Sequence, residues 1–86
     1  MDFGKALEQV KLGHRILRKG WNGKGQWVRL INPYSDQEFG IIEKMNAPYD
    51  SGTPMPYLAI HTTDNQFIPW LASQGDLLAE DWEVLE

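Results

Sequence analysis

The sequence predicts an α+β fold in which an N-terminal helix packs on a mainly antiparallel sheet beside a short second helix. Three observations indicate this class: an amphipathic helical stripe at the start, short apolar runs separated by turn residues, and a capped helical segment near the end. The 86 residues are expected to form a single small domain, residues 1–86. A domain of this size buries only about 60–65% of the surface that its unfolded chain exposes, so its core is thin.

The first helix is predicted over residues 3–12. Its apolar side chains recur every three or four positions, which places them on one face: Phe3, Ala6, Leu7 and Val10. Asp2 is a favourable N-cap, and Gly13 stands where a left-handed residue commonly ends a helix. The helix is therefore bounded by residues suited to both of its ends.

Two strands are predicted next, over residues 14–21 and 26–32. The Asn-Gly pair of "WNGKG" between them favours a tight hairpin turn. The stretch 33–56 contains four prolines and two glycines and reads as one long irregular segment. Within it, "FGIIEKM" is compatible with either a strand or a helical turn, and the pattern does not separate the two.

A second hairpin is predicted from residues 57–63 and 66–70, with its turn at Asp64-Asn65. Pro69 cannot donate a hydrogen bond to a neighbouring strand, so its strand is expected at an edge of the sheet or to end in a bulge.

The last elements are a short helix over residues 74–80 and a final strand over 81–85. Ser73 followed three positions later by Asp76 resembles a capping box, with Asp in place of the usual Glu.

Charge is unevenly distributed along the chain, which has a formal net charge of −4. Residues 1–29 contain seven Lys and Arg against two acidic residues, giving +5, and residues 30–86 contain one Lys against ten acidic residues, giving −9. Long nucleic acid is not an expected partner, because its binding depends on neutralising many phosphates. A compact anion that meets the basic third of the chain is compatible with this pattern.

Composition also limits chemistry and location. The chain has no cysteine, which excludes disulfides and thiolate metal sites. The start of the chain resembles neither a secretory signal nor a membrane span, so a cytoplasmic protein that does not bind membranes is expected.

Catalytic and metal-binding residues are not expected. His14 and His61 are the only histidines, and their spacing fits no helical metal motif. His61 and Thr62 are adjacent in a predicted strand, so their side chains point to opposite faces and cannot act as base and nucleophile. We therefore predict a protein that is not an enzyme and has no metal and no cofactor.

Four tryptophans in so short a chain indicate binding or assembly. Trp82, in the final strand, is expected in the core, and Trp27 fits either the core or an interface. Trp21 and Trp70 lie where strands end and backbone N–H groups become available. Two interpretations stay open for this pair: they wall a site for a ligand with a flat ring and an anionic group, or they pack against each other in the core or an interface.

Two stretches carry a family resemblance: "ILRKGWNGKGQW" and "PYLAIHTTDNQFIPWLASQGDLLAEDWEVL". Together with the N-terminal helix they make about two thirds of the chain similar to small phage proteins of the Thoeris anti-defence type-two family, and residues 33–55 match no motif. The resemblance implies a sponge that holds cyclic nucleotide immune signals without cleaving them, in the cytoplasm of the infected cell. These signals are glycocyclic ADP-ribose isomers and, for some members, cyclic di- or trinucleotides. It also implies a homotetramer with pockets between subunits.

The site expected from this resemblance and from residue chemistry consists of seven ligand-binding residues: Arg18, Trp21, Asn22, Lys24, Trp70, Ser73 and Asp76. The two indoles would stack on or wall an adenine, the Asn and Ser would donate to phosphate or ribose, the Asp would accept from ribose or the base amine, and either cation would offset pyrophosphate charge. The main alternative is a small oligomeric assembly or partner-binding module without a small-molecule ligand. A carbohydrate-binding domain and a cyclic nucleotide hydrolase are weaker alternatives.

Overall fold

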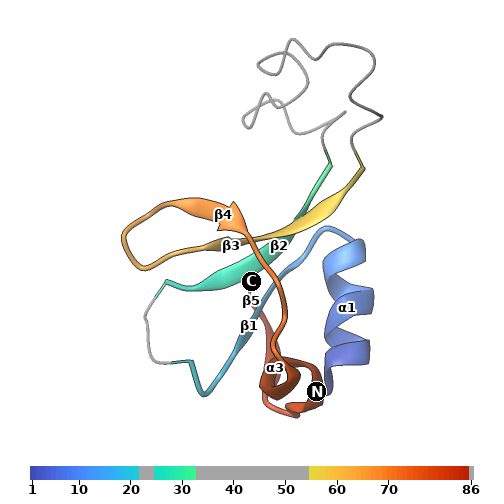
Figure 1. The fold of residues 1–86 in the computed structure, drawn as a ribbon. Helices are drawn as coiled ribbons and strands as arrows, with labels where there is room; N and C mark the ends of the chain where they lie inside the picture. Colours follow the sequence, from blue (N-terminus) through green and yellow to red (C-terminus); the bar gives the residue numbers. More distant parts are fainter. Residues whose placement is uncertain (22–24, 33–54, 86) are drawn as a thin grey trace, which may run out of the picture.

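The computed structural model describes residues 1–21, 25–32 and 55–85 (Figure 1). This part of the chain contains two helices and a five-stranded sheet, which confirms the predicted α+β class. The elements are, in chain order, α1 (Phe3–Lys11), β1 (Arg15–Arg18), β2 (Trp27–Ile31), β3 (Tyr57–His61), β4 (Phe67–Pro69), α3 (Gln74–Leu78) and β5 (Trp82–Leu85). The predicted turn at Asn22 and most of the irregular segment lie outside the described residues.

The ends of α1 follow from its caps. The Asp2 side chain accepts a hydrogen bond from the Lys5 backbone N–H at 2.9 Å, as expected of an N-cap. Gly13 has φ +99°, a left-handed conformation that glycine adopts without a steric penalty, and its N–H donates to the Val10 carbonyl oxygen at 3.1 Å. The helix therefore ends one residue before its predicted limit.

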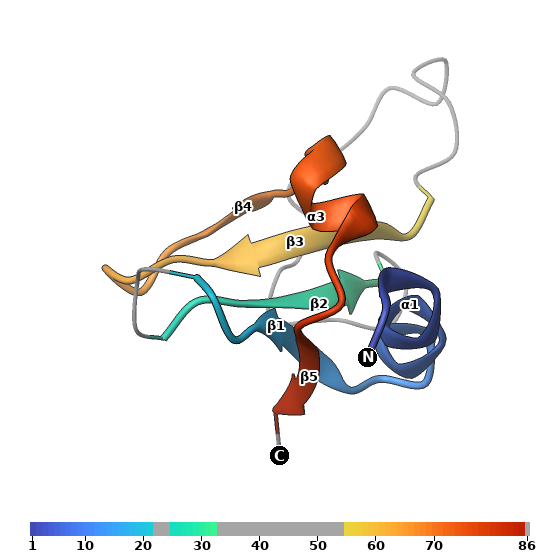
Figure 2. The ribbon, with the colours of Figure 1, turned by 90° about the horizontal axis from the view of Figure 1, so that it is seen from below.

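The sheet has the strand order β4-β3-β2-β1-β5, and every neighbouring pair is antiparallel. Hairpin neighbours lie side by side, whereas β5 returns from the end of the chain to pair with β1 over all four of its residues (Figure 2). The strands are shorter than their predicted ranges. Pro69 lies in β4 at an edge of the sheet, which confirms the expectation for a residue without a backbone donor.

One face of the sheet packs against α1 and forms the main core. Its fully buried members come from the helix and from three strands: Ala6, Val10, Ile16, Val28 and Trp82. Trp82 is 1% exposed, which confirms its predicted place in the core. Because side chains alternate along a strand, Trp27 points to the opposite face from Val28.

The short helix α3 begins as predicted and ends earlier. Ser73 is its N-cap, and the capping box with Asp76 is complete. The predicted range 74–80 is too long by two residues, because Ala79 already has extended backbone angles, φ −71° and ψ 150°. The chain then turns into β5, where the Trp82 N–H donates to the Met1 carbonyl oxygen at 3.1 Å and the Met1 amino group donates to the Trp82 carbonyl oxygen at 2.9 Å.

Candidate functional site: a tryptophan cluster and an arginine clamp

Four aromatic rings from distant parts of the chain meet at the junction of α1, β1 and α3, and we call Phe3, Trp21, Trp70 and Trp82 the tryptophan cluster. Trp82 lies at its centre, with the ring centroid of Trp21 at 5.4 Å and that of Trp70 at 6.0 Å. Trp21 and Trp70 are 6.3 Å apart with an angle of 69° between their planes. These edge-to-face contacts are a favourable arrangement of aromatic quadrupoles.

Trp21 and Trp70 are both partly exposed, in contrast to Trp82. Each follows the end of a strand and is held there by its backbone: the Trp21 N–H donates to the Arg18 carbonyl oxygen at 3.1 Å, and the Trp70 N–H donates to the Leu58 carbonyl oxygen at 2.9 Å. The two indoles pack against each other, as one of the two open interpretations expected. Each also keeps part of its surface accessible, so contact with a ligand is compatible with this packing.

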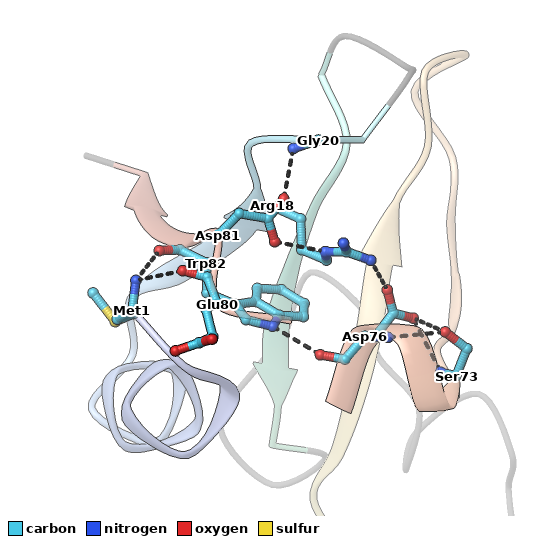
Figure 3. Close-up of polar contacts among 8 residues, drawn as sticks. All are labelled: Met1, Arg18, Gly20, Ser73, Asp76, Glu80, Asp81 and Trp82. Carbon is cyan, nitrogen blue, oxygen red and sulfur yellow. Dashed lines mark hydrogen bonds and ion pairs between the residues drawn. The ribbon is translucent and has the colours of Figure 1, made fainter. Parts of the chain in front are cut away.

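A charged network lies beside the cluster, and we call Arg18, Asp76 and Asp81 the arginine clamp (Figure 3). Arg18 Nε donates to Asp81 Oδ1 at 2.9 Å, and Arg18 Nη1 donates to Asp76 Oδ1 at 3.0 Å. The guanidinium therefore joins the end of β1 to α3 and to the turn that precedes β5.

Asp76 is the more enclosed of the two carboxylates, with 12% of its side chain exposed. Burial alone raises the pKa of Asp76. Hydrogen bonds from the Ser73 backbone N–H, from Arg18, from the Ser73 hydroxyl and from the Trp21 side chain outweigh that effect, so the pKa lies below its ordinary value. The carboxyl is therefore ionised at neutral pH.

Asp81 is held in the same state by the same cation. Its hydrogen bond from Arg18 lowers the pKa of Asp81, and burial opposes this with a smaller effect. A hydrogen bond from the Gly20 N–H to Asp81 Oδ2, at 2.9 Å, acts in the same direction as Arg18. The Arg18 pKa is raised, first by its hydrogen bond with Asp81 and then by that with Asp76.

The capping box of α3 occupies the side chains of Ser73 and Asp76. Asp76 Oδ2 accepts from the Ser73 N–H at 3.0 Å and from the Ser73 hydroxyl at 2.9 Å, while the Asp76 N–H donates to Ser73 Oγ at 3.1 Å. The Trp82 indole N–H donates to the Asp76 carbonyl oxygen at 2.9 Å, which ties α3 to the centre of the tryptophan cluster.

The fold brings five of the seven predicted site residues into this region: Arg18, Trp21, Trp70, Ser73 and Asp76. Asn22 and Lys24 lie outside the described residues. Sequence reasoning missed Asp81 as a member of the site. The available signal was its position beside Trp82, but only the pairing of Arg18 with Trp82 across β1 and β5 reveals that Asp81 lies next to the arginine.

A second aromatic group occupies the opposite face of the sheet, and we call Arg15, Trp27, His61 and Phe67 the Trp27 cluster. His61 stacks on Trp27 with a centroid distance of 4.7 Å and an interplanar angle of 5°. The ring nitrogens of His61 lie 2.6 Å from the Gly25 carbonyl oxygen and 2.8 Å from Asn65 Oδ1. The Thr62 hydroxyl donates instead to Asp64 Oδ1 at 2.6 Å, so histidine and threonine bond to different partners.

Two searches over residues 1–21, 25–32 and 55–85 were negative. Three or more His, Cys, Asp or Glu side chains do not gather there in an arrangement that could hold a metal ion. Neither helix in these ranges combines the length and the apolar character that a membrane crossing requires.

Comparison with known proteins shows the family. A family model described as "Thoeris anti-defense 2-like domain" matches residues 1–85. The chain belongs to this family. A relative named "Thoeris anti-defense 2", from Bacillus phage SP01, is 40% identical over 88 residues, which cover 99% of this chain and 94% of that protein. The family suggested by the two sequence motifs is therefore confirmed.

Membership in the Thoeris anti-defense 2-like family also covers the part of the chain that the motifs left unmatched, since the matched region includes residues 33–55. It supports an anti-Thoeris role for this protein, that of a phage counter-defence protein. The family description names opposition to a defence system and no reaction, which suggests a role without catalysis.

Proposed function

We propose that this protein binds cyclic nucleotide immune signals and sequesters them without cleavage, and in this way blocks Thoeris-type immunity in the cytoplasm of the infected cell. The ligands are glycocyclic ADP-ribose isomers, with cyclic di- or trinucleotides as further candidates. Family membership supports the anti-Thoeris part of the proposal. The observation that carries the ligand part is the pair of partly exposed indoles, Trp21 and Trp70, at one junction of the fold.

An indole face beside polar groups suits a purine nucleotide. Stacking of a base on an aromatic ring contributes about 1–3 kcal/mol and tolerates different bases, since each base presents a π face. Trp21 and Trp70 are held by backbone hydrogen bonds and by Trp82, so little ordering is required when a ligand binds. A preorganised stacking site is what a sponge needs, because it must compete with the signal's receptor at low concentration.

We further propose that the binding unit is a homo-oligomer, with four copies as the expected number. A domain with so small a core has little room for an internal pocket for a dinucleotide-sized ligand, and a pocket between copies avoids this limit. Exposed apolar side chains around α3 offer a surface for such contacts: Leu71 is 92% exposed and Leu78 is 79% exposed.

The same surface supports the main rival, an assembly module in which these side chains bind another protein and no small molecule is held. The packing of Trp21 against Trp70 fits that rival as well. The two functions differ in what happens to a free signal molecule, and that difference can be measured directly.

The test incubates the purified protein with a glycocyclic ADP-ribose, removes the protein by ultrafiltration and measures the signal in the filtrate. The retained protein is then heat-denatured, and the released material is analysed by mass spectrometry. We expect depletion of the signal and its recovery with unchanged mass. An unchanged filtrate would support the assembly module, and recovery of a product would show an enzyme.

A further inference from the structure

One carboxylate holds the turn that presents Trp21. The turn is closed by the hydrogen bond from the Trp21 N–H to the Arg18 carbonyl oxygen. Asp81 accepts from Arg18 Nε through Oδ1 and from the Gly20 N–H through Oδ2, each at 2.9 Å. A Cβ atom at Gly20 would lie 2.9 Å from Asp81 Oδ2, so this approach depends on glycine. Asp81 therefore fixes both the first and the third residue of the turn (Figure 3).

The other side of the arginine leads to the ring against which Trp21 packs. Arg18 Nη1 donates to Asp76 Oδ1, and the carbonyl oxygen of Asp76 accepts from the Trp82 indole N–H. The Trp82 ring meets Trp21 edge-on, with an interplanar angle of 79°. Arg18 thus connects the backbone that carries Trp21 with the neighbour that orients its ring.

The charges of the clamp do not favour direct contact between Arg18 and a phosphate. One positive and two negative groups give the clamp a net charge of −1. Both carboxyls have a lowered pKa and remain charged at neutral pH. An approaching phosphate would meet this net negative charge, and the guanidinium donors Nε and Nη1 already face carboxylates.

We infer that Arg18 is a positioning residue: through Asp76 and Asp81 it fixes the Trp21 indole in the orientation that receives the ligand, and it does not bind the phosphate. This inference rests on the proposed function for its ligand. It replaces the role that sequence reasoning gave to Arg18, which was to offset pyrophosphate charge.

Two substitutions separate the positioning role from a charge role. Arg18→Lys keeps the positive charge but loses the planar fork that holds two carboxylates. Asp81→Asn removes a negative charge and loses a charge-assisted acceptor. Positioning predicts that both weaken capture of glycocyclic ADP-ribose by about 5- to 150-fold, the range expected for a lost stacking contact. Phosphate binding predicts near-normal capture by Arg18→Lys and tighter capture by Asp81→Asn, and either result would overturn the inference.

Lys19→Gln is the matched control, since it removes an exposed positive charge one residue away. At physiological salt we expect its affinity to stay within about threefold of the original, because exposed charges are screened. A loss as large as that of Arg18→Lys would mean that charge, and not the clamp, determines capture.

The inference can also be tested without ligand. Both clamp variants are expected to lose the near-ultraviolet circular dichroism bands of the packed indoles while the far-ultraviolet spectrum is retained. Unchanged near-ultraviolet bands in folded variants would refute positioning. If a variant does not fold, the unaltered protein still gives an answer: the Gly20 amide should be protected from hydrogen exchange, and an unprotected amide would contradict the clamp.

These ligand-free measurements keep the two hypotheses apart. If the unaltered protein captures no signal, the proposed function fails, while the spectra and the Gly20 amide still report whether Arg18 orients Trp21.

Discussion

The two aromatic clusters of this protein are assembled in different ways. The Trp27 cluster follows from strand register, because Trp27 pairs with His61 and His61 pairs with Phe67 across adjacent strands. The tryptophan cluster joins segments that only the docking of α1, α3 and β5 brings together. The comparison teaches that ring contacts set by register depend on the sheet alone. Those of the candidate site depend on the whole tertiary arrangement.

The clusters also differ in burial and in the way charge is used. Trp82, at the centre of the tryptophan cluster, is 1% exposed, whereas Phe67 in the Trp27 cluster is 38% exposed. The tryptophan cluster adjoins a cation neutralised by two carboxylates. In the Trp27 cluster, the Arg15 guanidinium carbon lies 5.1 Å from the centroid of the Trp27 ring, a cation–π contact. These differences lead to four predictions of decreasing size.

The largest expected difference concerns stability. Trp82→Ala leaves a cavity in the core and removes the hydrogen bond to the Asp76 carbonyl oxygen, so we expect a loss of about 3–5 kcal/mol in the free energy of unfolding. Trp27→Ala, at a partly exposed position, should lose about 1 kcal/mol. Urea unfolding followed by far-ultraviolet circular dichroism, at matched protein concentration, measures both. Equal losses would show that the clusters do not differ in their contribution to the fold.

The second difference concerns ligand capture. Trp21→Leu keeps an apolar side chain against Trp82 but removes the stacking surface, and we expect signal affinity to fall by about 5- to 150-fold. Trp27→Leu, on the opposite face, is the control and should retain capture. Equilibrium dialysis gives both dissociation constants. Retention by Trp21→Leu together with loss in Trp27→Leu would move the site to the other face.

The third difference is the response to acid. Asp76 and Asp81 have a lower pKa in the folded protein than in the unfolded chain, so their contribution to stability is complete above about pH 5 and is lost as pH falls through about 4. Asp76→Asn should therefore reduce the free energy of unfolding by about 1–2 kcal/mol at pH 7 and by less at pH 3. Urea titrations at the two pH values test this. An equal loss at both would show that the carboxylate charge is not what stabilises the clamp.

The smallest expected effect is the cation–π contact of the Trp27 cluster. A double-mutant cycle with Arg15→Met and Trp27→Leu should give a coupling energy of about 0.5–1 kcal/mol, since the contact lies at a partly exposed site. Urea unfolding of the two single variants and the double variant supplies the value. A coupling energy near zero would leave the aromatic stack with His61 as the main contact of Trp27.

Much of the local structure follows from the sequence. The α1 stripe, the Asp2 and Ser73 caps, the edge position of Pro69 and the burial of Trp82 were all predictable, because each depends on near neighbours or on a simple alternation. The predicted element limits were too wide, since caps and pairing partners determine where an element ends. The sequence motifs also indicated the family.

The amino-acid sequence by itself therefore determined the fold class, the caps and the family, since local backbone chemistry and residue order carry that information. Only the tertiary structure decided that Arg18 meets Asp76 and Asp81, and that Trp21, Trp70 and Trp82 pack edge-on around one junction. The physical reason is that Arg18 and its two acidic partners are 58 and 63 positions apart in the chain. Their contact exists only after β5 has paired with β1 and α3 has docked beside the helix face of the sheet.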